Sequence, residues 1–149
     1  MTAATTSRIE RAAALALMER ALAESREEFG SFFLSRFFGL RISYEDERCI
    51  VAFDVSPAFY NPQGSLHGGV LATAMDISMG HLLHRTAGAG ATLTLTMQYL
   101  APVRSGTVRC EASFLRRGRS ISVLQAEAFG PDGALVAHAT GTWKLRAGK

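Results

Sequence analysis

The residues best suited to chemistry lie in one stretch, where a Pro- and Gly-rich loop runs directly into an apolar segment. The loop, Asn61–Gly69, reads N-P-Q-G-S-L-H-G-G, and the segment after it contains a single carboxylate, Asp76. A helix entered through two glycines has free backbone N–H groups in its first turn, and a ligand oxygen can approach that turn closely because it lacks Cβ atoms. The helix dipole adds partial positive charge at the same place. The turn is therefore suited to stabilising a developing oxyanion.

Asp76 is the second group that could do chemistry. Between Val70 and Leu83 apolar residues fall on nearly every side, which predicts a buried helix, and Gly88 provides a stop. Asp76 lies too far inside this helix to be an N-cap. Burying an unpartnered carboxylate costs on the order of several kcal/mol of folding free energy. A role as general base or nucleophile would explain why the residue is there. Without further information, the same residues are also compatible with a purely structural interpretation, in which His67-Gly68-Gly69 is a tight turn and Asp76 is a hydrogen-bonding group in the core.

The whole string resembles a known family. N-P-x-G-x-x-H-G-G, followed by Asp seven residues after the second Gly, resembles the hotdog-fold acyl-CoA thioesterases, and within them the phenylacetate-pathway type. The similarity covers residues 40–145 and extends to Thr92–Pro102, Arg117–Arg119 and Asp132–Thr142. It implies an α+β hotdog fold, in which an antiparallel sheet wraps around a long central helix, and it implies hydrolysis of a thioester.

The resemblance also assigns roles, in an active site that lies at a dimer interface. Gly68 corresponds to the residue whose backbone N–H meets the thioester carbonyl oxygen, and Asp76 to the general base or nucleophile. Asn61 corresponds to a loop residue that places the thioester or water, and Thr92 to a hydroxyl residue that positions the water. We expect His67 to hold the loop by hydrogen bonds, with a secondary role near the carbonyl. Asn before Pro is also a common turn former, and strand alternation alone would explain a polar residue at Thr92.

Two sets of residues are candidates for binding the substrate. Gly69 belongs to the same first turn, and Arg117, Gly118 and Arg119 form a basic turn between two predicted strands. In the family, basic residues of this region often contact coenzyme A phosphates, through charge-assisted and partly bidentate hydrogen bonds. The sequence alone fits an ordinary solvated turn equally well.

Two classes of function therefore remain. The protein is either an acyl-CoA thioesterase or a hotdog protein that binds an acyl-CoA or aromatic ligand without hydrolysing it. Asp76 favours the enzyme, because a binding protein has no need of a buried carboxylate. No cofactor is predicted. A metal site is not predicted either, because Asp76 and His81 lie about 140° apart on a helix and do not share a face.

The bulk properties set limits on partners and location. A chain of 149 residues with net charge +3 predicts one domain over 1–149, with 1–30 as a helical extension. The charge suits an anionic ligand such as coenzyme A and does not indicate nucleic acid. Cys49 and Cys110, in apolar strand-like contexts, are expected in the core, which fits a cytoplasmic protein. No apolar run approaches the ~20 residues of a membrane span, and we expect a homodimer or homotetramer.

The remaining elements follow from periodicity. Ser7 is predicted to cap a helix that runs to about Phe29, with Glu10 completing a capping box. Its apolar stripe is expected to pack on the protein's own sheet, with a subunit contact as the alternative. A short helix or turn rich in Phe is predicted over 31–38, with one or two Phe near the acyl group. Strands are predicted over 40–44, 49–55, 92–99, 108–114, 120–129 and 135–145, and in the third of these Leu93, Leu95, Met97 and Tyr99 share one face.

Overall fold

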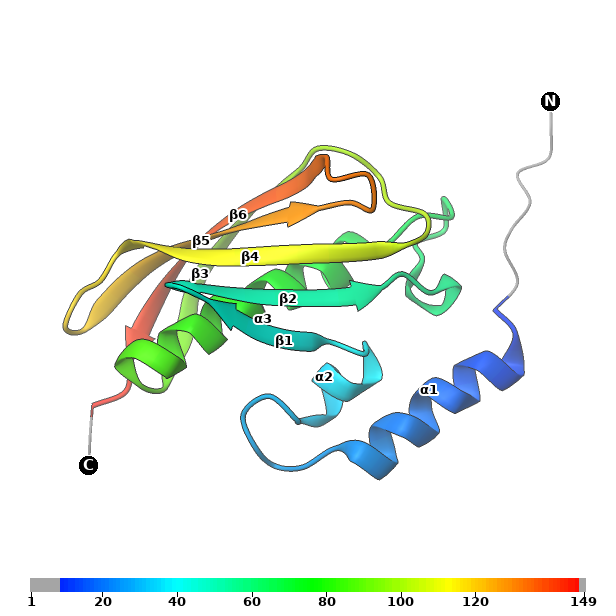
Figure 1. Cartoon of the computed structure of the whole chain (residues 1–149), viewed down its shortest axis with the longest axis horizontal. Helices are drawn as coiled ribbons and strands as arrows, with labels where there is room; N and C mark the ends of the chain where they lie inside the picture. Colours follow the sequence, from blue (N-terminus) through cyan, green and yellow to red (C-terminus); the bar gives the residue numbers. More distant parts are fainter. Residues whose placement is uncertain (1–8, 148–149) are drawn as a thin grey trace.

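A computed structural model describes residues 9–147 and shows an antiparallel six-stranded sheet wrapped around one long helix, α3 (Gly68–Ala87) (Figure 1). The strand order is β1-β2-β4-β5-β6-β3. Two shorter helices, α1 (Arg11–Glu24) and α2 (Phe33–Phe37), precede the sheet. The predicted α+β architecture is confirmed. The strands are β1 (Arg41–Glu45), β2 (Arg48–Asp54), β3 (Gly90–Tyr99), β4 (Thr107–Arg116), β5 (Ile121–Phe129) and β6 (Leu135–Leu145).

Small residues on the inner face of the sheet let α3 approach closely. Across β4, β5 and β6, the buried pairs Cys110–Ala128 and Ala126–Ala139 stand opposite each other. On the helix side, Gly80 faces Trp143 of β6, and a Cβ at position 80 would lie 2.8 Å from the Trp143 ring. Buried residues alternate with more exposed ones along β5 and along β4 as far as Ser113, which follows from the two-residue period of a strand.

Strand β3 departs from its predicted pattern. A bulge between Thr92 and Thr94 breaks the alternation that the sequence predicted for 92–99. Leu95 and Met97 pack against the core as expected, but Leu93 and Tyr99 are each 53% exposed. Leu93, at the bulge, therefore leaves the inner face that was predicted for these residues, because the extra residue redirects its side chain. Tyr99 lies beyond the bulge and keeps the face of Leu95 and Met97, since its hydroxyl bonds to Gly68 of α3.

The N-terminal helix is shorter than predicted. Helix α1 ends at Glu24 and not near Phe29, since Ser25 has extended backbone and the Arg26 side chain donates to the Ala23 and Ser25 carbonyls. The predicted cap, Ser7, lies outside the described residues, and Glu10 occupies the N-cap position without a side-chain cap bond.

The apolar stripe of α1 does not pack on the sheet. Helix α1 contacts α2, apart from the sheet (Figure 1). Leu15, Met18 and Leu22 are exposed, and Ala21 is the buried residue of the helix. The expectation that this stripe packs on the protein's own sheet was therefore wrong.

The Phe-rich segment around α2 and the two cysteines contribute to the hydrophobic core. Phe37 and Phe38 of the α2 region pack against Phe59, with ring centroids 6.0 and 5.1 Å away. Cys49 and Cys110 are buried free thiols, and burial raises the pKa of each to about 12. None of the helices within residues 9–147 combines the length and apolar character needed to cross a membrane.

Candidate active site at the start of the central helix

The first turn of α3 has one open backbone donor. His67 is the N-cap, and its Nδ1 accepts a hydrogen bond from the Gly69 N–H at 2.8 Å. The Val70 and Leu71 N–H groups donate to the His67 carbonyl. The Gly68 N–H has no acceptor among residues 9–147. Of the orphan donors at this helix end, Gly68 therefore offers the one that can meet a ligand oxygen.

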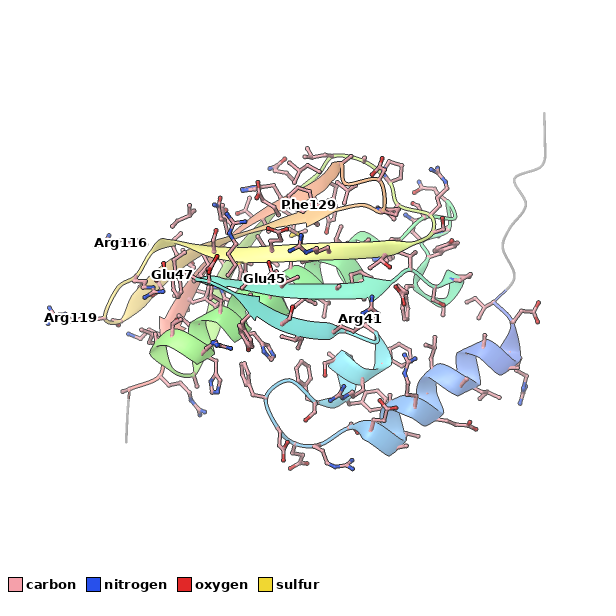
Figure 2. The ribbon with its side chains drawn as sticks, viewed as in Figure 1. Arg41, Glu45, Glu47, Arg116, Arg119 and Phe129 are labelled. Atoms are coloured by element: carbon pink, nitrogen blue, oxygen red, sulfur yellow. The ribbon has the colours of Figure 1, made fainter. Side chains whose placement is uncertain are left out.

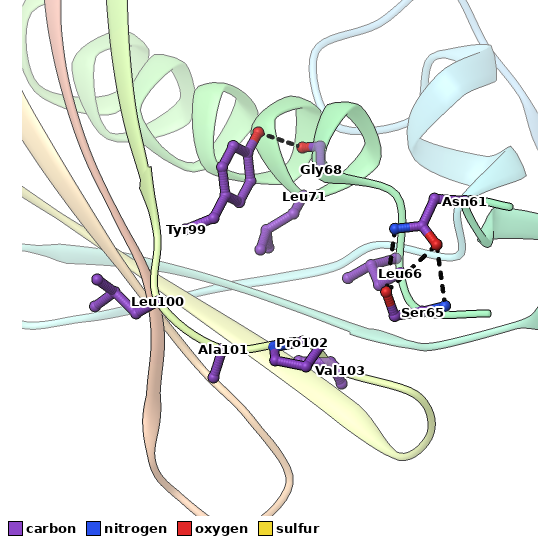
Figure 3. Close-up of a pocket in the computed structure, with 10 residues that line it drawn as sticks. All are labelled: Asn61, Ser65, Leu66, Gly68, Leu71, Tyr99, Leu100, Ala101, Pro102 and Val103. Atoms are coloured by element: carbon purple, nitrogen blue, oxygen red, sulfur yellow. Dashed lines mark hydrogen bonds between the residues drawn. The ribbon is translucent and has the colours of Figure 1, made fainter. Parts of the chain in front are cut away.

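A pocket of about 310 Å³ opens beside this turn (Figure 3). The Tyr99 ring covers Gly68, and its hydroxyl donates to the Gly68 carbonyl at 2.7 Å. A Cβ at position 68 would lie 2.9 Å from Tyr99 Cζ. Sequence reasoning missed Tyr99 as a site residue, because alternation placed it with the core residues of its strand. Other residues that line the pocket are Asn61, Ser65, Leu66, Leu71, Pro102 and Val103.

Asn61 organises the loop that forms one wall of the pocket. Its Oδ1 accepts from the backbone N–H groups of Gln63 and Ser65, at 3.0 and 3.2 Å, and its Nδ2 donates to Ser65 Oγ at 3.1 Å (Figure 3). This is the geometry of an Asx turn. The loop is further fixed because the Leu66 N–H donates to the Val103 carbonyl. Asn61 thus lines the pocket with both ends of its amide engaged in shaping the loop.

Asp76 lies two turns further along α3, partly buried. Thr92 Oγ1 donates to Asp76 Oδ1 at 2.9 Å, across the gap between α3 and the bulge of β3. Burial raises the pKa of the Asp76 carboxyl, and the Thr92 hydrogen bond offsets this only in part. The sequence could not predict which influence prevails. A half-buried carboxylate with a raised pKa and one positioned hydroxyl is suited to take up a proton.

One chain does not bring Gly68 and Asp76 to the same reacting group. They are eight residues apart on one helix, or roughly 12 Å along its axis. The pocket beside Gly68 is lined by neither Asp76 nor Thr92. An oxyanion donor and a base must each lie about 3 Å from the thioester and its water. Within a single chain, Gly68 and Asp76 therefore cannot both contact one thioester.

The basic turn lies elsewhere. Residues 117–120 connect β4 to β5, and Arg116 and Arg119 stand at the tip of this hairpin, at the other end of the sheet from the loop that leads into α3 (Figures 1 and 2). The Arg117 guanidinium lies over the Phe114 ring and 3.6 Å from a Glu47 carboxylate oxygen. The Gly118 N–H donates to Ser122 Oγ. The structure of one chain therefore separates Arg117, Gly118 and Arg119 from the pocket beside Gly68.

His81 and His84 do not form a cluster with Asp76. His81 is buried, and its Nδ1 lies 3.1 Å from the Tyr44 hydroxyl, while the His84 ring stacks on Phe29. Within residues 9–147, no three His, Cys, Asp or Glu side chains gather in a way that could hold a metal ion.

Comparisons with known proteins agree with this architecture. The sequence model of the thioesterase superfamily matches residues 63–137. The medium/long-chain acyl-CoA thioesterase YigI of Salmonella typhimurium is 30% identical, with 74% of this chain and 84% of YigI covered.

Two solved structures share the fold. The BH2602 protein of Bacillus halodurans, determined with CoA, is 23% identical with a TM-score of 0.85, covering 97% of this chain and 99% of that chain. The PaaI protein from the Escherichia coli phenylacetic acid degradation operon is 20% identical with a TM-score of 0.77, covering 89% of this chain and 98% of that chain. At these identities the two structures speak for the fold alone. On its sequence match the chain belongs to the thioesterase superfamily, and its fold is the hotdog fold.

Proposed function

We propose that this protein hydrolyses an acyl-CoA thioester to a free acid and coenzyme A. The observation that carries the proposal is the environment of Asp76, the single carboxylate of helix α3. Asp76 is half-buried, accepts a hydrogen bond from Thr92, and has its pKa raised by burial. A carboxylate in such a place destabilises the fold when it is ionised, so a chemical role explains its presence better than a structural one. The names of curated relatives, such as the acyl-CoA thioesterase YigI, support the same substrate class.

The proposed reaction uses one backbone donor and one carboxylate. The thioester carbonyl oxygen accepts from the Gly68 N–H, which stabilises the negative charge that develops there. A water oxygen attacks the carbonyl carbon while Asp76 takes its proton, and Thr92 holds the carboxylate in place. The tetrahedral intermediate then collapses, the C–S bond breaks, and the coenzyme A sulfur leaves with a proton returned from Asp76.

The site requires a second copy of the chain. Because Gly68 and Asp76 lie roughly 12 Å apart along one helix, we propose that Gly68 of one subunit and Asp76 of another act on the same thioester. Strand β3 supports this arrangement, since it is an edge strand with Leu93 and Tyr99 exposed. Pairing of two β3 edges about a two-fold axis would set the two α3 helices side by side in opposite directions.

Arg117 and Arg119 are proposed to contact coenzyme A phosphates and not to take part in the chemistry. Both are exposed, and Arg119 makes no side-chain hydrogen bond or ion pair within the part of the chain that the structure describes. Because the hairpin tip lies far from the pocket of its own chain, such a contact would be made to substrate bound elsewhere in the oligomer. Loss of both guanidinium groups would raise KM with little change in kcat.

The test of the proposal is Asp76→Asn, assayed over a panel of aliphatic and aromatic acyl-CoA esters with free thiol as the readout. We expect kcat to fall on the order of 10²-fold or more, the scale of losing a general base, while acyl-CoA binding by calorimetry is retained. A near-normal kcat would reject the assignment. Absence of hydrolysis of every ester by the wild type, with binding retained, would leave the alternative function, a non-catalytic acyl-CoA or aromatic ligand-binding protein.

Thermal unfolding of the same variant tests whether Asp76→Asn leaves the protein folded. The folded-state pKa of Asp76 is raised, so the protonated form stabilises the fold, and this stability is lost as pH rises through that pKa. Asp76→Asn mimics the protonated form at every pH. It should therefore raise Tm at neutral pH and have little effect on Tm at low pH.

A single turnover in oxygen-18 water, with enzyme in excess, separates two uses of the carboxylate. A general base leaves the label in the released acid. A nucleophilic Asp76 forms a mixed anhydride with loss of the thiolate. Water attack at the Asp76 carbonyl then places label on the protein, whereas attack at the acyl-side carbonyl labels the acid, as a general base does. Label on Asp76 would establish the covalent route.

A further inference from the structure

A second cleft lies on the other side of α3 from Asp76. It measures about 490 Å³ and is formed by the segment around Gly30, by α2, by β1 and by His81 of α3. It shares no residue with the pocket beside Gly68. The Phe29 ring packs on the rings of His81 and His84, at 4.5 and 4.0 Å, and thereby places this segment over the helix.

Two buried nitrogens of residues that line this cleft have no hydrogen-bond partner among the described residues: Arg36 Nε and His81 Nε2. His81 is only 4% exposed. The Tyr44 hydroxyl is 3.1 Å from its other nitrogen, Nδ1, and when Tyr44 donates this hydrogen bond the neutral ring carries its proton on Nε2. Buried polar groups are nearly always satisfied. Because both nitrogens are enclosed in this structure, a ligand with hydrogen-bond acceptors reaches them only when the Phe29 segment over His81 moves aside.

The cleft also has a positive charge without a counter-ion. The Arg36 side chain makes no hydrogen bond or ion pair with any residue in 9–147. Arg41, on the same cleft, is neutralised by Asp54 at 3.1 Å. The rest of the lining mixes polar and apolar surface, and its apolar side chains include Leu40 and Ile42. A planar guanidinium beside apolar walls suits a planar anion that carries an apolar group.

We propose that this cleft binds a small organic carboxylate, with its carboxylate oxygens on Arg36 and His81 Nε2 and its apolar group against Phe29 and Leu40. The site is separate from the proposed hydrolytic centre and does not depend on hydrolysis being the function. Its ligand class is a monocarboxylate with an aromatic or branched apolar group small enough for the cleft.

Binding should be linked to protonation of His81. Burial, reinforced by His84, lowers the His81 pKa to about 4, so the ring is neutral at pH 7. The groups that face it are Tyr44 from β1, His84 of its own helix and the Phe29–Gly30 segment; Arg85 lies over the Tyr44 ring, and Arg36 and Arg41 line the same cleft. No carboxylate of the described residues is hydrogen-bonded to His81. A bound carboxylate would be its nearest negative charge and should raise its pKa by roughly one unit or more.

The experiment titrates the wild-type protein with benzoate, benzamide and inorganic phosphate while the His81 ring resonances are followed by NMR. We expect saturable shifts with benzoate, much weaker ones with neutral benzamide, and an upward shift of the His81 pKa in the benzoate complex. Equal responses to benzoate and benzamide, a stronger response to phosphate, or no response of His81 to benzoate would each overturn the proposal.

A pair of variants localises the site. Arg36→Met should weaken benzoate binding, as reported by His81, on the order of tenfold or more. Arg116→Met removes the same charge at the exposed β4–β5 hairpin and should leave this affinity unchanged. Equal affinities in the two variants would remove Arg36 from the site. Should Arg36→Met fail to fold, the ligand series on the wild type still decides the proposal.

Discussion

Two opposing influences act on the Asp76 carboxyl: burial raises its pKa, and the Thr92 hydroxyl lowers it. Thr92→Val removes the hydroxyl and nearly keeps the volume, so the pKa should rise further. Hydrolysis needs the ionised form, and activity therefore increases as pH rises through this pKa. We expect the acidic limb of the kcat/KM profile of Thr92→Val to move to higher pH, with Thr92→Ser close to the wild type.

Thr94→Val is the matched control for this change. Thr94 lies on the same strand, but its hydroxyl bonds to Thr142 and not to Asp76. Its pH profile should match that of the wild type. If both Val variants shift the profile equally, the effect comes from the strand and not from the Asp76 hydrogen bond.

The Gly68 N–H can be removed without disturbing the helix. Pro is tolerated at the first helical position, and the backbone of His67, with φ −62° and ψ 131°, is the extended conformation that the residue before Pro prefers. Gly68→Ala introduces the same Cβ beside Tyr99 and keeps the N–H. We expect Gly68→Pro to lose on the order of 10²- to 10³-fold in kcat relative to Gly68→Ala, the scale of losing one oxyanion donor. Similar rates for the two variants would show that this N–H is not used.

At the scale of elements, the contact between α3 and β6 depends on Gly80. Gly→Ala inside a helix usually stabilises by up to about 1 kcal/mol. Here the new Cβ would lie 2.8 Å from the ring of Trp143, which is buried, and overpacking of this kind costs about 1–3 kcal/mol. Gly80→Ala should therefore lower Tm. In a Trp143→Phe background the same change should cost less, and an undiminished cost in that double mutant would locate the strain elsewhere.

The elements that could be predicted are those with one dominant pattern. Helix α3 is apolar on nearly all sides and is capped by Gly88, whose φ of 98° favours glycine, and alternation runs through β5 and most of β4. The bulge in β3 could not be predicted, because the alternation Thr-Leu-Thr-Leu continues through it in the sequence. The end of α1 was missed because its apolar stripe includes Phe29, which instead stacks on His84.

The candidate site was predictable in its residue types but not in its arrangement. The loop, the double glycine and Asp76 stand out in the sequence, as does Thr92. Tyr99 does not, since its contact with Gly68 comes from how β3 crosses α3. The separation of Gly68 from Asp76 follows from helix geometry alone, and it shows that residues close in sequence need not act on one substrate molecule.

At the scale of the whole molecule, one edge of the sheet looks incomplete. Strand β3 is ten residues long and forms an edge, and Leu93, Tyr99 and Leu100 near it are exposed. Long, exposed, apolar edge strands are templates for pairing with another chain. The opposite edge, β1, has five residues and alternates in exposure. The asymmetry favours β3 as the contact between subunits of a dimer, which is the arrangement proposed above for the active site.

Mixing two inactive variants tests this arrangement directly. Gly68→Pro chains keep Asp76, and Asp76→Asn chains keep Gly68, so neither variant alone has a complete site. In a mixed dimer with sites shared between chains, one site combines the intact Gly68 of one subunit with the intact Asp76 of the other, and the second site lacks both. Equal mixing by co-refolding makes half of the dimers mixed, so activity should recover to about a quarter of the wild-type value per chain. If each site were built within one chain, the mixture would stay as inactive as its parts. Sedimentation of the mixture confirms that dimers have re-formed, so a lack of recovery in re-formed dimers would rule out a shared site.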